Sequence, residues 1–204
     1  MSTRLAAGVA LGYPVAVIAG SFLEMPRLPL AWLALLILVL AWKALPVFGR
    51  AVMALALAML VLLLGTEPAG KWLIYAVPVL IQGALAWLFA RSLRPGSTPL
   101  ITRYALAMGA SDSPPVHRYT QRLTVAWALL CGGLALLSAV LAATVSTTTW
   151  ALFANGINYM FLAALFMLEY PLRCRVLRDE PRAGFLPYLA ALARADHRRI
   201  LRQR

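Results

Sequence analysis

The feature that most constrains this sequence is a series of long apolar runs without a charged residue. Trp72–Ala90 and Trp150–Leu168 are two of them. A helix that crosses the hydrocarbon layer of a membrane, about 30 Å thick, needs about 20 mainly apolar residues. The spanning segment must be helical because its backbone polar groups find no water there and have to pair within the chain. The runs therefore predict an all-α fold, a polytopic membrane helical bundle.

The composition also favours a bilayer as the solvent. Of 204 residues, 62% are hydrophobic and 13% are charged, whereas a soluble domain has about 45–50% apolar and about 25% charged residues. A chain this short cannot bury so much apolar side chain in one core. Its hydrophobicity is also too high for a disordered chain. A soluble globular domain and a disordered chain are thus both excluded.

About six transmembrane helices are predicted. The expected spans cover residues 5–23, 28–45, 47–65, 72–90, 123–144 and 150–168. The bundle then occupies residues 1–170, and a basic tail follows over 171–204. The first apolar run also partly resembles a signal peptide, so its cleavage remains an alternative. Its length favours a membrane span.

The basic residues predict the orientation of the bundle. When the N-terminus is placed inside, all of the 19 Lys and Arg residues except Arg27 and Lys71 fall on the cytoplasmic side. This is the distribution expected of an inner-membrane protein, and it requires an even number of spans with both termini cytoplasmic. The net charge of +12 is therefore read as a topology signal. Nucleic acid is not expected as a partner, because its usual footprint is a basic face on a soluble fold.

Two cytoplasmic segments are long enough to matter, the loop 91–122 and the tail. In the loop, Thr98 and Pro99 predict the start of a short helix, as N-cap and first helical residue, and Gly109 predicts its end. The tail predicts a second basic amphipathic helix, with Phe185, Tyr188 and other apolar residues on one face. Helices of this type lie in the membrane interface.

The two basic segments either anchor the chain or bind something anionic. The second interpretation makes them a surface for a phosphorylated ligand, a lipid headgroup or an acidic protein. The candidate residues in the loop are Arg91, Arg94, Arg103, His117, Arg118 and Arg122.

Polar residues inside the spans form a second group of candidates. They are Tyr75, Gln82, Asn155, Asn158, Tyr159 and Glu169. Such groups commonly form hydrogen bonds between helices. They can also line a polar pocket for a headgroup or a conjugated acyl chain. Glu169 precedes Arg173 by four residues, a spacing that favours an ion pair on a helix.

The sequence offers no catalytic, cofactor-binding or metal-ligating motif. Cys131 and Cys174 are isolated, and the two histidines, His117 and His197, lack the spacing of metal ligands. No catalytic residue, cofactor or metal is therefore assigned, and an enzyme is the less favoured interpretation.

Several motifs occur in an order that resembles a known family. They begin with Ser92-Leu93-Arg94-Pro95-Gly96 and Pro99-Leu100-Ile101-Thr102-Arg103, continue with Tyr119-Thr120-Gln121-Arg122-Leu123-Thr124, and end with Trp150-Ala151-Leu152-Phe153-Ala154-Asn155, Asn158-Tyr159 and Glu169-Tyr170. They are similar to small bacterial inner-membrane proteins from gene clusters for aryl polyene pigments such as xanthomonadin. The resemblance covers residues 72–204. It implies a role beside enzymes that build a polyene on acyl carrier proteins, and it assigns no catalytic residue.

The leading hypothesis is an inner-membrane accessory protein for an aryl-polyene or other lipid-like product. Through its basic surface it would dock anionic headgroups, acyl carrier protein or enzymes of the same pathway, because carrier proteins are usually acidic. One alternative is a flippase or exporter subunit that uses the polar faces of the fourth and sixth spans. Another is a membrane enzyme acting on an activated acyl or phosphate-bearing substrate, with Arg94, Arg103, His117, Arg118 and Glu169 as candidates.

Overall fold

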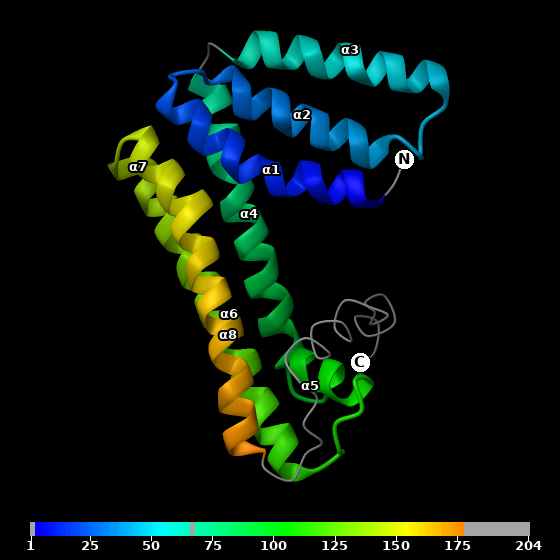
Figure 1. Ribbon diagram of the computed structural model, residues 1–204, viewed down its shortest axis with the longest axis vertical. Helices are drawn as coiled ribbons and strands as arrows, with labels where there is room; N and C mark the ends of the chain where they lie inside the picture. Colours follow the sequence, from blue (N-terminus) through cyan, green and yellow to red (C-terminus); the bar gives the residue numbers. More distant parts are fainter. Residues whose placement is uncertain (1–2, 66–67, 178–204) are drawn as a thin grey trace. The chain divides into compact units, whose positions relative to one another are not determined.

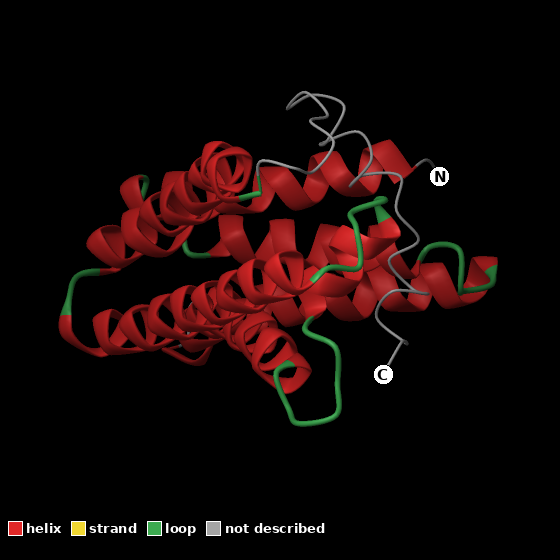
Figure 2. Ribbon diagram, turned by 90° about the horizontal axis from the view of Figure 1, so that it is seen from below, coloured by secondary structure: helices red, strands yellow, loops and turns green. Residues whose placement is uncertain are grey.

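The computed structural model describes residues 3–65 and 68–177, and every regular element in that part of the chain is helical (Figures 1 and 2). The elements are α1 (Thr3–Phe22), α2 (Arg27–Ala41), α3 (Val47–Leu64), α4 (Pro68–Ser92), α5 (Leu100–Ala107), α6 (Pro114–Thr144), α7 (Thr147–Leu152), the π-helical turn η1 (Phe153–Ile157) and α8 (Asn158–Val176). The all-α prediction is confirmed for these residues.

Four helical stretches in the described part are long and apolar enough to cross a membrane. They are Val47–Leu64, Gly70–Ser92, Pro114–Thr144 and Thr147–Val176. The apolar parts of the first two helices, Ala6–Phe22 and Arg27–Ala41, are shorter. Each of the six predicted spans thus corresponds to an apolar helix, and four of these helices have the length of a complete crossing.

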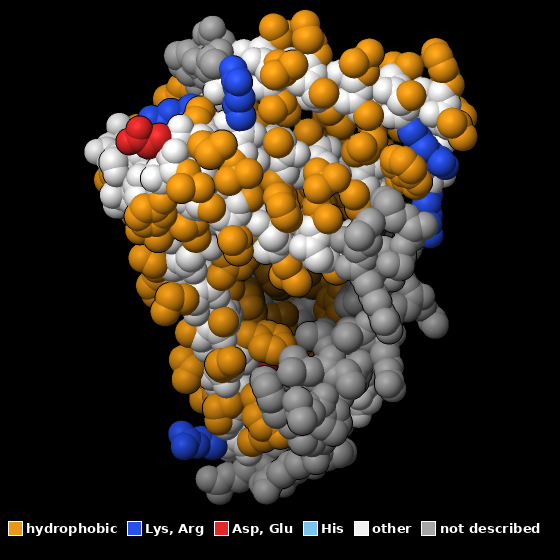
Figure 3. Space-filling model, turned by 45° about the horizontal axis from the view of Figure 1, so that its top comes forward, with side chains coloured by type: hydrophobic (Ala, Val, Ile, Leu, Met, Phe, Trp, Pro, Cys, Tyr) orange, Lys and Arg blue, Asp and Glu red, His pale blue; other side chains and the backbone are white. Residues whose placement is uncertain are grey.

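Hydrophobic side chains dominate the surface as well as the core. Helix α3 has no buried residue, and Phe48 and Leu55 are 80% and 74% exposed. Figure 3 shows hydrophobic side chains spread over α1–α3, with the charged ones confined to a few places. A soluble monomer rarely exposes apolar patches of this extent. The surface is that of a protein whose solvent is lipid.

The chain divides into two compact units, and each is discontinuous in sequence. Unit 1 contains Met1–Leu80 and Leu136–Tyr159, and unit 2 contains Ile81–Ala135 and Met160–Arg204. Helices α4, α6 and α8 each begin in one unit and end in the other. The two units are described separately below.

In unit 1, α1 and α2 lie side by side (Figure 1), and a glycine allows their close approach. A Cβ atom at Gly12 would lie 2.5 Å from Cζ2 of Trp32. The indole of Trp32 covers α1 at this point, and its Nε1 donates a hydrogen bond to the Val9 carbonyl over 2.7 Å. The small residue therefore makes room for an aromatic ring whose polar atom is satisfied in the apolar interface.

The end of α1 has an unusual backbone. Glu24 has φ of +54°, and it is the non-glycine residue with positive φ in the described part of the chain. The Met25 amide donates to the Gly20 carbonyl over 2.9 Å, which is the long-range bond of a Schellman-type helix end. Glycine usually occupies the left-handed position, because a Cβ there is strained.

Arg50, near the start of α3, caps the C-terminal end of α2. Arg50 Nε donates to the carbonyls of Trp42 and Leu45, over 2.9 and 3.0 Å. Its guanidinium also lies 4.9 Å from the centre of the Trp42 ring. Carbonyls at a helix C-terminus have no partner within the helix and carry partial negative charge, so a cation there is favourable.

In unit 2, the short helix predicted in the loop is confirmed as α5, which packs on α6. The hydroxyls of Thr102 and Thr120 are 2.7 Å apart and buried. The predicted N-cap is wrong by one residue, because Pro99 occupies that position and has no side-chain capping bond. The Ser92 hydroxyl instead accepts a hydrogen bond from the Leu100 amide over 2.9 Å.

Two helices extend beyond the predicted spans. Helix α6 begins at Pro114, ahead of the span predicted from residue 123, so the second half of the expected cytoplasmic loop is helical. Helix α8 continues through Pro171 to Val176, into the segment expected to be a tail. The amphipathic helix expected in that tail, around Phe185 and Tyr188, lies outside the described residues.

Candidate functional site

The candidate site of unit 2 is a pocket lined by α4, α5, α6 and α8, and it is named here the Glu169 pocket. Its volume is about 330 Å³, within the range of about 300–1,000 Å³ typical of small-molecule sites. Its walls are mostly apolar and aromatic. The lining residues are Leu85, Leu88, Phe89, Leu100, Ile101, Tyr104, Ala105, Met108, Tyr119, Thr120, Leu123, Trp127, Phe166, Glu169 and Arg173.

A buried carboxylate forms the polar end of this pocket. Glu169 is 6% exposed. The Tyr119 hydroxyl donates to the Glu169 carbonyl over 3.2 Å and reaches its Oε1 at 3.4 Å. Within the described residues, Oε2 has no hydrogen-bond partner. Because burying an unsatisfied polar oxygen costs about 1–3 kcal/mol or more, this atom is suited to a ligand that donates a hydrogen bond.

Aromatic rings from α4 and α6 form part of the apolar lining of the pocket. Phe89 and Trp127 stack with ring centres 5.9 Å apart and planes 22° apart. On α5, burial raises the pKa of Tyr104, which therefore stays neutral at physiological pH. The pocket thus combines flat apolar surfaces with phenol hydroxyls, one carboxylate and the guanidinium of Arg173.

Arg103, one of the basic candidates, is directed into the protein. It is 9% exposed, and its Nε donates to the Thr98 carbonyl over 2.7 Å. Burial lowers the pKa of its guanidinium. Arg103 therefore stabilises the start of α5 and does not belong to an open basic surface.

The other basic candidates of unit 2 remain accessible to different degrees. Arg91, Arg94, Arg118 and Arg122 are exposed; the guanidinium of Arg91 lies 5.0 Å from the centre of the Trp87 ring. His117 is half-buried, and its Nε2 lies 2.6 Å from Asp112 Oδ1.

The candidates on α7, η1 and α8 divide into structural and exposed groups. Asn158 is fully buried, and its Nδ2 donates to the Ser138 hydroxyl over 3.0 Å. Asn155 is also buried, in the π-helical turn, where its Nδ2 donates to the Ala151 carbonyl over 3.3 Å. Tyr159 is 50% exposed. Asn158 thus joins two helices within unit 1, whereas the hydrogen bond of Asn155 stays within its own helical stretch.

The two candidates on α4 also differ. Tyr75 is 2% exposed, and its ring lies against Trp150 with centres 4.2 Å apart. Gln82 is 6% exposed, and its Oε1 has no hydrogen-bond partner within the described residues. Tyr75 belongs to unit 1 and Gln82 to unit 2.

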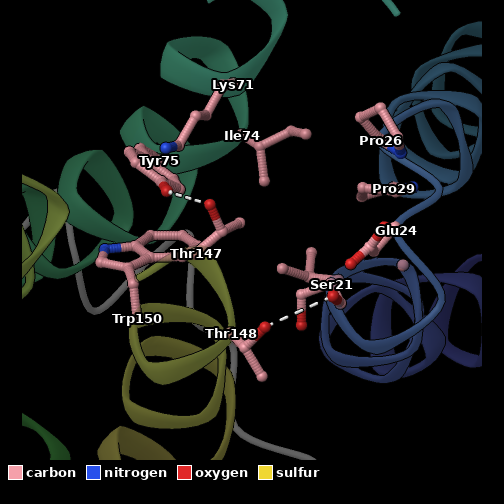
Figure 4. Close-up of a pocket in the computed structure, with 12 residues that line it drawn as sticks. Ser21, Glu24, Pro26, Pro29, Lys71, Ile74, Tyr75, Thr147, Thr148 and Trp150 are labelled. Atoms are coloured by element: carbon pink, nitrogen blue, oxygen red, sulfur yellow. Dashed lines mark hydrogen bonds between the residues drawn. The ribbon is translucent and has the colours of Figure 1, made fainter. Parts of the chain in front are cut away.

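A second pocket lies in unit 1 and is named here the Lys71 pocket (Figure 4). Its volume is about 380 Å³. It is formed by the α1–α2 connection and the N-terminal ends of α4 and α7. Its lining residues are Val17, Gly20, Ser21, Glu24, Pro26, Pro29, Lys71, Ile74, Tyr75, Thr147, Thr148 and Trp150.

Sequence reasoning missed most of the residues that complete the two pockets. Tyr119 and Glu169 are separated by 50 positions, and neither lies in a motif that joins them. Glu24 carries no signal in the sequence, because its special backbone follows from the helix end and not from a glycine. Glu169 and Tyr75 were among the predicted candidates and line the two pockets. Lys71 offers a further signal, because it is one of the two basic residues on the predicted outer face.

Among residues 3–65 and 68–177, no cluster of His, Cys, Asp and Glu could hold a metal ion. In comparisons with known proteins, no family model, no curated protein and no solved structure matches the chain.

Proposed function

We propose that this chain is a multi-pass inner-membrane protein that holds a lipid-like molecule in the Glu169 pocket. The observation that carries the proposal is an apolar cavity that ends at a buried carboxylate with one unpaired oxygen. The ligand would have a long apolar chain, matched to the walls, and a hydrogen-bond donor for Glu169. A conjugated polyene is the chain we favour, given the resemblance of the sequence to aryl-polyene cluster proteins.

The positive-inside distribution supports a topology with both termini in the cytoplasm. The Glu169 pocket would then lie at the cytoplasmic ends of α4, α6 and α8. The two shorter apolar helices, α1 and α2, are compatible with this topology. The α1–α2 pair returns the chain to its starting side whether it crosses the membrane twice or lies at the surface, so the number of crossings stays even.

The exposed arginines next to this pocket support a docking role. Arg118 and Arg122 lie on the first turns of α6, the helix that also carries Tyr119. A basic surface beside a pocket for an apolar chain suits an acidic acyl carrier protein, which presents its chain at an acidic surface. The protein would act as an accessory component that receives or holds the product.

The proposal is tested by binding of a linear conjugated tetraene alcohol, parinaryl alcohol, to the purified protein in detergent. Energy transfer from tryptophan to the tetraene reports binding. The share of this signal that is lost in Trp127→Phe comes from tetraene bound in the pocket, because Trp127 lines it. We expect wild-type protein to bind the alcohol about tenfold more tightly than its methyl ether, because a hydrogen bond to a charged group contributes about 1.5–3 kcal/mol. Glu169→Leu should remove this preference.

A matched pair on α5 tests the location. Ala105 is buried and lines the pocket, whereas Ala107 is exposed on the same helix. Ala105→Leu should weaken tetraene binding about tenfold by filling the cavity, and Ala107→Leu should leave it unchanged. Equal binding by both variants, or an ether bound as well as the alcohol by wild-type protein, would overturn the proposal.

A further inference from the structure

The Lys71 pocket has opposite charges on its two sides. Figure 4 shows Lys71, Ile74 and Tyr75 of α4 on one side, and Glu24 with the α1–α2 connection on the other. The basic and the acidic side both lie within unit 1, whereas the Glu169 pocket lies within unit 2.

The α4 side presents donors suited to a phosphate. Lys71 Nζ lies 5.3 Å from the centre of the Tyr75 ring, a distance at which the ring stabilises the ammonium without using its three donors as hydrogen bonds. The Tyr75 hydroxyl donates to Thr147 Oγ1 over 3.1 Å. Because Thr147 accepts that bond, its own hydroxyl hydrogen is left to donate. An ammonium and a hydroxyl thus lie together.

The opposite side presents an acceptor suited to an ammonium group. The Glu24 carboxylate is turned toward the space between α4 and the α1–α2 connection (Figure 4). Glu24 and Lys71 are both described by the structure, and it records no ion pair between them. The positive φ of Glu24 places this side chain at the rim at the cost of backbone strain.

The floor of the pocket is apolar although its rim is charged. Ile74, Tyr75 and Trp150 are 7%, 2% and 0% exposed, whereas Glu24 and Lys71 are exposed. A ligand that fits has charges of both signs at one end and apolar groups below them. This is the chemistry of a phospholipid with a zwitterionic headgroup.

We propose that the Lys71 pocket binds the headgroup of a phospholipid whose phosphate is balanced by a primary ammonium, as in phosphatidylethanolamine. Lys71 and Thr147 would receive the phosphate, and Glu24 would receive the ammonium. A lipid with only a phosphate would bring its charge close to Glu24, and a lone cation would meet Lys71. The pair of charges thus favours the zwitterion over either ion alone.

The test is native mass spectrometry of the full chain in detergent with three probes. These are dihexanoyl phosphatidylethanolamine, dihexanoyl phosphatidylglycerol and water-soluble phosphoethanolamine. We expect the ethanolamine lipid to bind about tenfold more tightly than the glycerol lipid. It should also bind more tightly than phosphoethanolamine, because the apolar floor contacts the glycerol and acyl part. Equal binding of phosphoethanolamine would overturn the lipid as the source of the headgroup.

Variants assign the binding to this pocket. Lys71→Met should weaken binding of the ethanolamine lipid about tenfold, and Glu24→Gln should abolish its preference over the glycerol lipid. Lys43→Met, at an exposed lysine outside the pocket, should change neither value. Tetraene binding in the Glu169 pocket should be the same in all three variants, which separates the two proposals. An unchanged affinity in Lys71→Met, or a retained preference in Glu24→Gln, would overturn this one.

Discussion

The Asn158 side chain donates a hydrogen bond from Nδ2 to the hydroxyl of Ser138, over 3.0 Å, where both residues are fully buried. The same turn of α6 also accepts a bond from α7, since Trp150 Nε1 donates to the Ser138 carbonyl over 3.0 Å. One residue of α6 thus receives two polar groups from the neighbouring helical segment. In an apolar surrounding these two bonds fix which faces of the helices meet.

Ser138→Ala should destabilise the protein by about 0.6–1.7 kcal/mol, the range measured for hydrogen bonds between helices in membranes. The reason is that the Asn158 amide loses its acceptor and stays buried. The measurement is the free energy of unfolding from a denaturant titration in mixed micelles. Thr144→Ala is the control, because that hydroxyl is exposed and bonds only within its own helix, to the Val140 carbonyl. An equal loss in both variants would contradict the prediction.

Glu24→Gly should stabilise the protein by about 0.5–1 kcal/mol, because glycine adopts the left-handed conformation without strain. Glu24→Ala removes the same carboxylate but keeps a Cβ, so it should give no such gain. Thermal unfolding of the two variants in detergent measures the difference. If alanine stabilises as much as glycine, the effect arises from the charge and not from the backbone.

Tyr104 should make the stability of unit 2 fall at alkaline pH. Burial raises the pKa of its phenol in the folded protein above the ordinary value of about 10. Above about pH 10 the unfolded chain therefore loses this proton more readily than the folded protein does, and the free energy of unfolding decreases as the pH rises.

The measurement is the unfolding free energy of the wild type and of Tyr104→Phe between about pH 9 and pH 11. The wild type should lose more stability over this window than the variant. Parallel pH profiles would show that Tyr104 makes no contribution. Because the comparison uses slopes, it is not affected by a constant difference in stability between the two proteins.

Arg118→Glu should weaken binding of an acidic acyl carrier protein about three- to fivefold at low salt, a magnitude typical of exposed charges at an interface. Lys43→Glu is the matched control, since it makes the same change of charge at an exposed residue of the other unit, outside both pockets. Co-purification at low and high salt measures the effect. Retention that is equal in both variants, or insensitive to salt, would contradict docking through this surface.

The helices were predictable because their signal is local. Mainly apolar runs identify each of the long apolar helices among the described residues, although Arg50 lies within α3. The proline at residue 114 marks the start of α6, whose first turns contain polar residues. The predicted span starts at residue 123 because Arg118, Gln121 and Arg122 precede it, and helix α6 extends further toward its N-terminus to include them. They are exposed residues of the same helix.

The pockets could not be predicted because their signal is tertiary. Arg103 belonged to the basic pattern, yet its side chain turns back to the Thr98 carbonyl. The spacing of Asn155 and Asn158 suggested one polar face. Asn155 instead lies within the π-helical turn and Asn158 follows it, and their side chains donate to different residues, Ala151 and Ser138. No spacing rule in the sequence reveals that Tyr119 reaches Glu169 or that Glu24 lies opposite Lys71.

The continuity of α4, α6 and α8 through both packing units has a consequence for how this protein can change in evolution. Each unit is assembled from two separate stretches of chain, so no single crossover between genes could exchange one unit and leave the other intact. Every junction between them falls within a helix. A single crossover therefore cannot separate the two units, whereas a point substitution within one unit can change its pocket and leave the other unit intact.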